Sequence, residues 1–136
     1  MTQAWPAHLF MVGCGNMAGQ MLARWLACGL DPARVTVLRP SGRAVADGVQ
    51  VMTSYPASLP AQATIILGMK PYQLDEVAVP LAPLCTSDTR IISILAGTPI
   101  KDLRQCFPAV QDVIRAMPNL PVALGQGVTG LYADGD

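Results

Sequence analysis

The chain has 136 residues, of which 51% are hydrophobic and 13% are charged. This length and composition suit one globular domain with its own core, and they exclude a disordered chain. Nine basic residues balance nine acidic ones, which argues against nucleic acid or an anionic membrane as a partner. No apolar run reaches the roughly 18 residues of a membrane-spanning helix, and no signal-peptide pattern is present, so we expect a cytoplasmic location.

Six apolar segments of strand length follow one another along the chain. Several are continuous instead of alternating, which is typical of parallel strands covered on both faces. The expected strands are residues 8–13, 34–38, 49–53, 63–69, 90–97 and 110–117. The chain then continues through "RAMPNLPVALGQGVTGL" to the polar residues "YADGD", without a closing helix.

Helical spacing appears between these strands. Residues 16–28 carry an apolar face at spacings of three and four, with Asn16 as the expected N-cap and Gly29 as the C′ residue. Residues 71–84 form a second apolar face that Pro80 shortens or kinks, and residues 99–106 allow one or two turns. Alternating strands and helices predict a single doubly wound α/β domain, a mostly parallel Rossmann sheet with helices on both faces.

A glycine motif joins the first strand to the first helix. Gly13, Gly15 and Ala18 fit the pattern G-x-G-x-x-G/A at that junction. The first glycine permits a tight turn, the second lets a diphosphate approach the backbone, and the small third residue lets the helix pack closely on the sheet. The amide groups of the first helical turn then face the phosphates. A plain glycine-bearing turn is the alternative.

The end of the second strand bears on which dinucleotide would bind. NAD sites usually place a carboxylate there for the ribose 2′-hydroxyl. Here the sequence is "VLRPSGR", with Arg39, Ser41 and Arg43 and no carboxylate before Asp47. Because arginine holds a 2′-phosphate by charge-assisted bonds, we expect NADPH to be preferred over NADH. Solvated loop arginines are the alternative.

Two further strand ends are expected to face the cofactor. "LGMKPYQ" ends the fourth strand in a stiff turn at Met69, Lys70 and Pro71, and "ILAGTP" ends the fifth at Ala96 and Gly97. An exposed lysine and a routine strand-ending glycine are the alternatives here.

Other reactive side chains do not form a catalytic pattern. His8 precedes the first strand, away from the expected crevice, and is read as a surface or packing residue. Cys14, Cys28, Cys85 and Cys106 have no CxxC spacing and are expected to be reduced and structural. No metal site and no catalytic residue can be assigned, although hydride transfer remains open because a cofactor would carry that chemistry.

Four segments together resemble a known family. "VGCGNMAGQML", "ILGMKPYQ", "IISILAG" and above all "RAMPNLPVALGQGVTGL" are similar to the N-terminal, cofactor-binding domain of pyrroline-5-carboxylate reductases. The resemblance covers Leu9 to about Leu131. It implies hydride transfer from NADPH, sometimes NADH, to the C=N carbon of 1-pyrroline-5-carboxylate, a small-molecule substrate, giving L-proline.

The resemblance also implies roles for individual residues. Gly13, Gly15, Asn16, Met17 and Ala18 would bind the diphosphate, and Arg39 and Ser41 the 2′-phosphate. Met69, Lys70, Pro71, Ala96 and Gly97 would border the nicotinamide. Met117, Pro118 and Asn119 would form the turn near the substrate, unless that turn is a plain Pro-Asn loop.

This chain departs from the family pattern in several places. Leu38 and Pro40 flank Arg39 where the family usually has Asn-Arg-Ser/Thr, Tyr55 replaces an asparagine near the ribose, and Leu120 stands where threonine is usual. Family chains are about twice as long, are homo-oligomeric, and add a C-terminal helical dimerisation domain that is absent here. We therefore expect cofactor binding with little turnover. A sibling NADP-dependent reductase and a stand-alone dinucleotide-binding module remain as alternatives.

Overall fold

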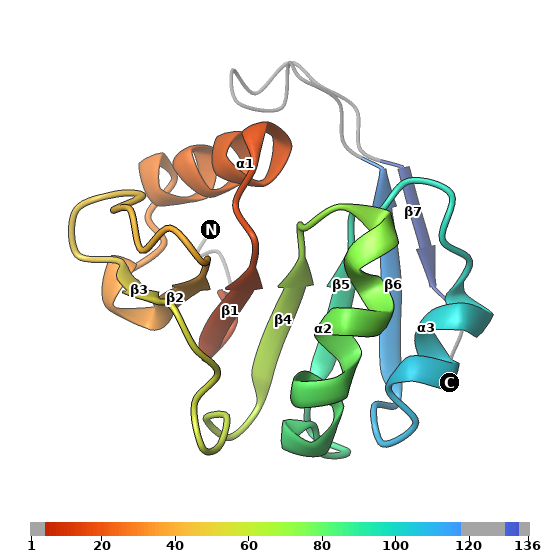
Figure 1. Cartoon of the computed structure of the whole chain (residues 1–136). Helices are drawn as coiled ribbons and strands as arrows, with labels where there is room; N and C mark the ends of the chain where they lie inside the picture. Colours follow the sequence, from red (N-terminus) through yellow and green to blue (C-terminus); the bar gives the residue numbers. More distant parts are fainter. Residues whose placement is uncertain (1–4, 118–129, 134–136) are drawn as a thin grey trace.

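The chain folds around one sheet, which a computed structural model describes over residues 5–117 and 130–133 (Figure 1). The strands lie in the order β3-β2-β1-β4-β5-β6-β7. Their bounds are β1 His8–Val12, β2 Val35–Leu38, β3 Gln50–Met52, β4 Ala63–Leu67, β5 Arg90–Ser93, β6 Asp112–Met117 and β7 Gly130–Ala133. Strands β1 to β6 are parallel to one another, and β7 is antiparallel to β6. The predicted mostly parallel, doubly wound sheet is confirmed.

The winding of the sheet reverses at β1. Strands β2 and β3 are added on one side, where Leu9 lies opposite Val35, and β4 lies on the other side, where Leu9 lies opposite Thr64. Crossovers that leave a parallel sheet in opposite directions open a crevice beyond the carboxyl ends of the strands at that point. The topology therefore locates a crevice between the ends of β1 and β4.

Helices cover both faces of this sheet (Figure 1). They are α1 (Asn16–Ala27), α2 (Leu74–Leu81) and α3 (Ile100–Cys106), with short 3-10 turns η1 (Pro32–Arg34), η2 (Pro71–Gln73) and η3 (Ala82–Leu84). Leu9 and Met11 pack with α1, whereas Phe10 and Val12 pack with α2 and α3. Because successive strand residues point to opposite faces, these helices lie on opposite sides. The prediction of helices on both faces is confirmed.

Burial on both faces explains the continuous apolar runs. Every residue of β2 and β4 is buried. A strand without a solvent-facing side has no polar positions to alternate with apolar ones. The helices complete the two cores with the faces that the spacing predicts: Ala18, Met21 and Leu22 of α1 and Leu74, Ala78 and Leu81 of α2 are buried.

Several element boundaries differ from the predictions. Gly15, not Asn16, is the N-cap of α1, and Asn16 is the first helical residue. The strands expected over 63–69 and 90–97 end at Leu67 and Ser93. After Ser93 the chain turns, and the Leu95 amide donates to the Ser93 hydroxyl (3.2 Å) instead of continuing the ladder. The predicted C′ residue of α1 is confirmed, because Gly29 follows the Cys28 C-cap with φ +111°.

Strand β7 was not predicted from the sequence. Its residues were read partly as a polar tail, yet Tyr132 lies opposite Arg115 in an antiparallel pair. An antiparallel strand tolerates polar residues better than a buried parallel one. The apolar pattern that identified the other strands is therefore missing here.

Three backbone segments approach one another closely at the end of β1. Gly13 has φ +77°, and a Cβ there would lie 3.0 Å from the Met69 backbone. A Cβ on Gly68 would lie 2.9 Å from the Cβ of Ala18. The turn after β1, the start of α1 and the end of β4 therefore fit together only because residues 13 and 68 are glycines and residue 18 is small.

We predict that Gly68→Ala lowers the free energy of unfolding by about 1–3 kcal/mol, since the added methyl group overpacks the contact with Ala18. Urea denaturation of the purified chain measures this change. Gly15→Ala is the control, because a Cβ at residue 15 has no neighbour within 4 Å and φ is −79°. That variant should stay within about 1 kcal/mol of the wild type. A Gly68→Ala protein as stable as the wild type would contradict the packing described.

Candidate functional site

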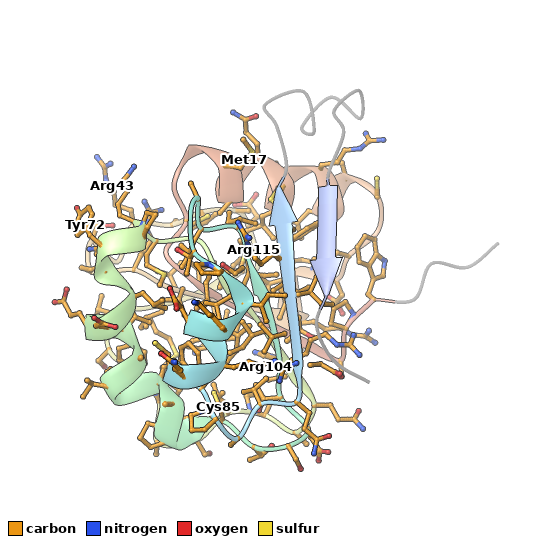
Figure 2. The ribbon with its side chains drawn as sticks, turned by 90° about the vertical axis from the view of Figure 1, so that its right-hand side faces the viewer. Met17, Arg43, Tyr72, Cys85, Arg104 and Arg115 are labelled. Atoms are coloured by element: carbon orange, nitrogen blue, oxygen red, sulfur yellow. The ribbon has the colours of Figure 1, made fainter. Side chains whose placement is uncertain are left out.

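A large cavity lies at the carboxyl ends of β1, β2, β4 and β5. Its volume is about 1110 Å³, slightly above the range of about 300–1,000 Å³ that is usual for small-molecule sites. Figure 2 shows Met17, Arg43 and Tyr72 at the end of the molecule toward which β6 points, whereas Cys85 lies near the opposite end. Ten of the predicted cofactor residues line the cavity: Gly13, Gly15, Met17, Ala18, Arg39, Ser41, Met69, Lys70, Pro71 and Ala96.

The first helix begins at the wall of this cavity. The earliest bond of α1 runs from the Gly19 amide to the Gly15 carbonyl (2.8 Å), so the amides before Gly19 have no intrahelical acceptor. The N-cap residue, Gly15, has no side chain to accept from them, and the first turn holds no acidic residue. This helix start thus presents amide groups and the positive end of the helix dipole to the cavity, an arrangement that favours an anion.

Gly15 differs from the two glycines that close packing requires. Its φ is −79°, which any residue can adopt, and a Cβ there would meet no atom within 4 Å. Neither backbone conformation nor a protein neighbour therefore demands glycine at this position. The open space in front of residue 15 fits a bulky group that approaches the backbone from the cavity.

A positively charged side chain faces the same turn from β2. Arg39 is half-buried, and its backbone is held by the bond from its amide to the Met52 carbonyl (2.9 Å). Burial raises the pKa of the neighbouring Cys14 thiol, and the nearby Arg39 guanidinium opposes that increase. The positive charge of Arg39 therefore acts electrostatically on a residue of the glycine turn. Ser41 lies beyond it, where its hydroxyl accepts from the Arg43 amide (3.3 Å).

The turn after β4 is held by the side chain of Gln73, which was not among the predicted site residues. The Lys70 amide donates to the Gln73 side-chain oxygen (3.0 Å), and the Gln73 amide donates to the Lys70 carbonyl (2.9 Å). Together with Pro71 at the start of η2, these bonds make the turn stiff, as predicted. The sequence contained a signal for this bond, since Gln73 stands three residues after Lys70, the N-cap of η2, in a capping-box position.

Not all predicted site residues line the cavity. Gly97 has φ +67° and is outside the lining. Asn16 is the first residue of α1, and its side chain is outside the described part of the structure. Met117 ends β6, opposite Gly130 of β7. Pro118 and Asn119 lie outside the described residues. Their assignments therefore stay predictions.

The cavity also has a wall that was not predicted. Thr53 and Tyr55 after β3, and Glu76, Val77 and Pro80 on α2, all line it. Tyr55 was noted only as a departure from the family pattern. The residues of α2 were missed because the packing of α2 above the crevice depends on the whole sheet, not on local spacing.

The remaining titratable residues lie as follows. His8 at the start of β1 is half-buried, with its Nε2 3.1 Å from the Thr36 hydroxyl, and burial lowers its pKa. All four cysteines are free. Cys85 is buried, which raises its pKa to about 11, whereas Cys28, the C-cap residue of α1, is exposed.

Within residues 5–117 and 130–133, no three His, Cys, Asp or Glu side chains are grouped so as to hold a metal ion. Over the same described ranges, none of the helices combines the length and apolarity needed to cross a membrane.

The fold and the site together define a Rossmann-type α/β domain. The family model described as "NADP oxidoreductase coenzyme F420-dependent" matches residues 9–97, and the chain belongs to this family. It is 33% identical over 127 residues to the pyrroline-5-carboxylate reductase of Haemophilus influenzae and 32% identical over 132 residues to that of Pseudomonas aeruginosa. These alignments cover 90% and 93% of this chain, but 46% and 48% of the relatives.

Solved structures agree with this assignment. A pyrroline-5-carboxylate reductase from Coxiella burnetii superposes with a TM-score of 0.82 at 27% identity, covering 95% of this chain and 50% of that one. The fold is also that of Plasmodium falciparum pyrroline carboxylate reductase with NADP bound (TM-score 0.78, 18% identity), which covers 94% of this chain and 48% of that one. The resemblance to the N-terminal domain of the reductases is confirmed, and the chain spans about half the length of these relatives.

Proposed function

We propose that residues 1–136 form the NADP(H)-binding domain of a pyrroline-5-carboxylate reductase, which reduces the C=N bond of 1-pyrroline-5-carboxylate to give L-proline. The observation that carries this proposal is the open space in front of Gly15 at an uncapped helix start. The names of the relatives supply the reaction. When bound, NADPH supplies the hydride, and the protein orients it.

In this proposal each strand end binds one part of the cofactor. The turn at Gly13, Gly15, Asn16, Met17 and Ala18 holds the diphosphate through amide groups. Arg39 and Ser41 hold the 2′-phosphate, and Met69, Lys70, Pro71, Ala96 and Gly97 border the nicotinamide. Met117, Pro118 and Asn119 lie nearest the substrate. The stiff Lys70–Gln73 turn keeps its side of the cavity in place without help from a ligand.

The charges of the cavity support a preference for NADPH. Arg39 lines it directly after β2, whereas Asp47, the first carboxylate after that strand, is outside the lining. A guanidinium forms strong charge-assisted bonds with a phosphate, and there is no carboxylate at the strand end to hold a ribose hydroxyl or repel the phosphate.

Turnover needs more than this chain. The chain spans about half of its relatives, and no described residue is assigned as catalytic. We propose that the substrate contacts and the homo-oligomeric interface of the family come from the other half of such enzymes. The 136-residue chain should then bind cofactor and form little or no proline by itself.

A second candidate follows from the description of the family model, which names coenzyme F420. A sibling NADP-dependent reductase would use the same dinucleotide cavity with another second substrate. The "RAMPN" motif, which begins in β6, favours the pyrroline reductases, because the sequence resemblance there is the most particular.

We predict that Gly15→Asp abolishes measurable NADPH binding in calorimetric titration, because the side chain adds bulk and negative charge where the diphosphate would approach. Gln20→Asp places the same charge on α1 at a residue outside the cavity lining, and its affinity should match the wild type. Circular dichroism checks that both variants are folded. Unchanged NADPH affinity in folded Gly15→Asp would remove the proposed site.

We further predict that Arg39→Ala weakens NADPH binding by roughly tenfold or more and NADH binding by less than about threefold, since only NADPH carries the 2′-phosphate. The affinities of the two dinucleotides are measured in parallel. Arg43→Ala removes an equal charge from the same loop, but Arg43 is exposed and outside the lining, so its NADPH-to-NADH ratio should be unchanged. Equal wild-type affinity for both dinucleotides would contradict the preference.

A further inference from the structure

Two side chains of the cavity wall are not used by the assignments above. Tyr55 follows β3, and Glu76 lies in the first turn of α2, and both line the cavity. Glu76 is the sole carboxylate among the described lining residues. A negative charge there conflicts with phosphate binding, so the part of a ligand next to Glu76 is expected to be uncharged and to donate hydrogen bonds.

The side chain of Tyr55 is held in place by the core. It is half-buried and packs against the cluster that contains Leu38 and Leu74, while it also lines the cavity. Burial raises the pKa of its hydroxyl, and the nearby Glu76 carboxylate raises it further. The ring is therefore neutral at physiological pH, and both side chains line the same cavity.

The sheet order indicates which part of a dinucleotide reaches these two side chains. In the proposed function the diphosphate lies at the turn after β1 and the ribose phosphate at Arg39 after β2. A base that extends in the same direction would lie towards β3. The next strand is β3, and Tyr55 follows it. The flat base thus arrives beside an aromatic ring that the core supports.

We propose that Tyr55 and Glu76 form a recognition site for a 6-aminopurine. The Tyr55 ring stacks on the base, and the Glu76 carboxylate accepts a hydrogen bond from the exocyclic amino group. A carboxylate accepts and cannot donate, so a 6-oxopurine, which presents an oxygen at that position, is disfavoured. This inference rests on the proposed cofactor binding and adds the selectivity for the base.

The experiment compares NADPH with deamino-NADPH, in which hypoxanthine replaces adenine, by calorimetric titration of the 136-residue chain. The wild type should bind deamino-NADPH at least roughly tenfold more weakly, as expected for a lost hydrogen bond to a charged group. Glu76→Gln offers both a donor and an acceptor, so the two dinucleotides should then bind within about threefold of each other.

Asp75→Asn is the matched control for Glu76→Gln. It removes the same charge from the same turn of α2, but Asp75 is outside the lining, so the discrimination between the two dinucleotides should persist. The role of the ring is tested with Tyr55→Leu, which keeps an apolar side chain against the core but lacks the π face. This variant should bind each dinucleotide roughly tenfold more weakly than the wild type.

The outcomes separate this inference from the proposed function. If the wild type binds NADPH and deamino-NADPH equally well, or Asp75→Asn loses the discrimination as Glu76→Gln does, the role of Glu76 is overturned while cofactor binding stands. Unchanged affinities in folded Tyr55→Leu overturn the role of Tyr55. If the wild type binds neither dinucleotide, the proposed function itself fails and this site fails with it.

Discussion

The close approach of Gly13, Gly68 and Ala18 at the end of β1 is the constraint on which the site depends. A Cβ at either glycine would meet backbone or side-chain atoms within about 3 Å, so the turn, the helix and the neighbouring strand end can meet in this way only with these small residues. The contact positions the start of α1 above the carboxyl ends of β1 and β4. Gly15, two residues after Gly13, faces open space.

The charges around the cavity follow from this arrangement. The start of α1 forms part of its wall, Arg39 and Lys70 add positive charge after β2 and β4, and Glu76 adds a negative charge from α2. An elongated ligand with phosphates at its centre and a hydrogen-bond-donating base at one end is complementary to that pattern. A dinucleotide has these properties, and the family of the chain is one of NADP oxidoreductases.

The sequence predicted the parts of the molecule that depend on local pattern. Apolar runs located β1 to β6, and those of β2 and β4 are continuous because strands buried on both faces have no polar positions. The glycine spacing located the cavity wall at Gly13 and Gly15. The sequence did not predict β7, because this antiparallel edge strand is short and its residues are partly polar. Tyr55 and Glu76 were missed because they come together only when α2 packs over the ends of the strands.

The central claim is that an anion rests on the amide groups at the start of α1. Nitrogen-15 NMR of the labelled chain during titration with NADPH tests it directly, with the amides of α3 (Ile100–Cys106) as an internal control away from the site. The account predicts that the amide signals of Gly15, Met17 and Ala18 shift most, and that inorganic pyrophosphate shifts the same signals. Binding of NADPH that leaves these three signals unchanged would contradict it.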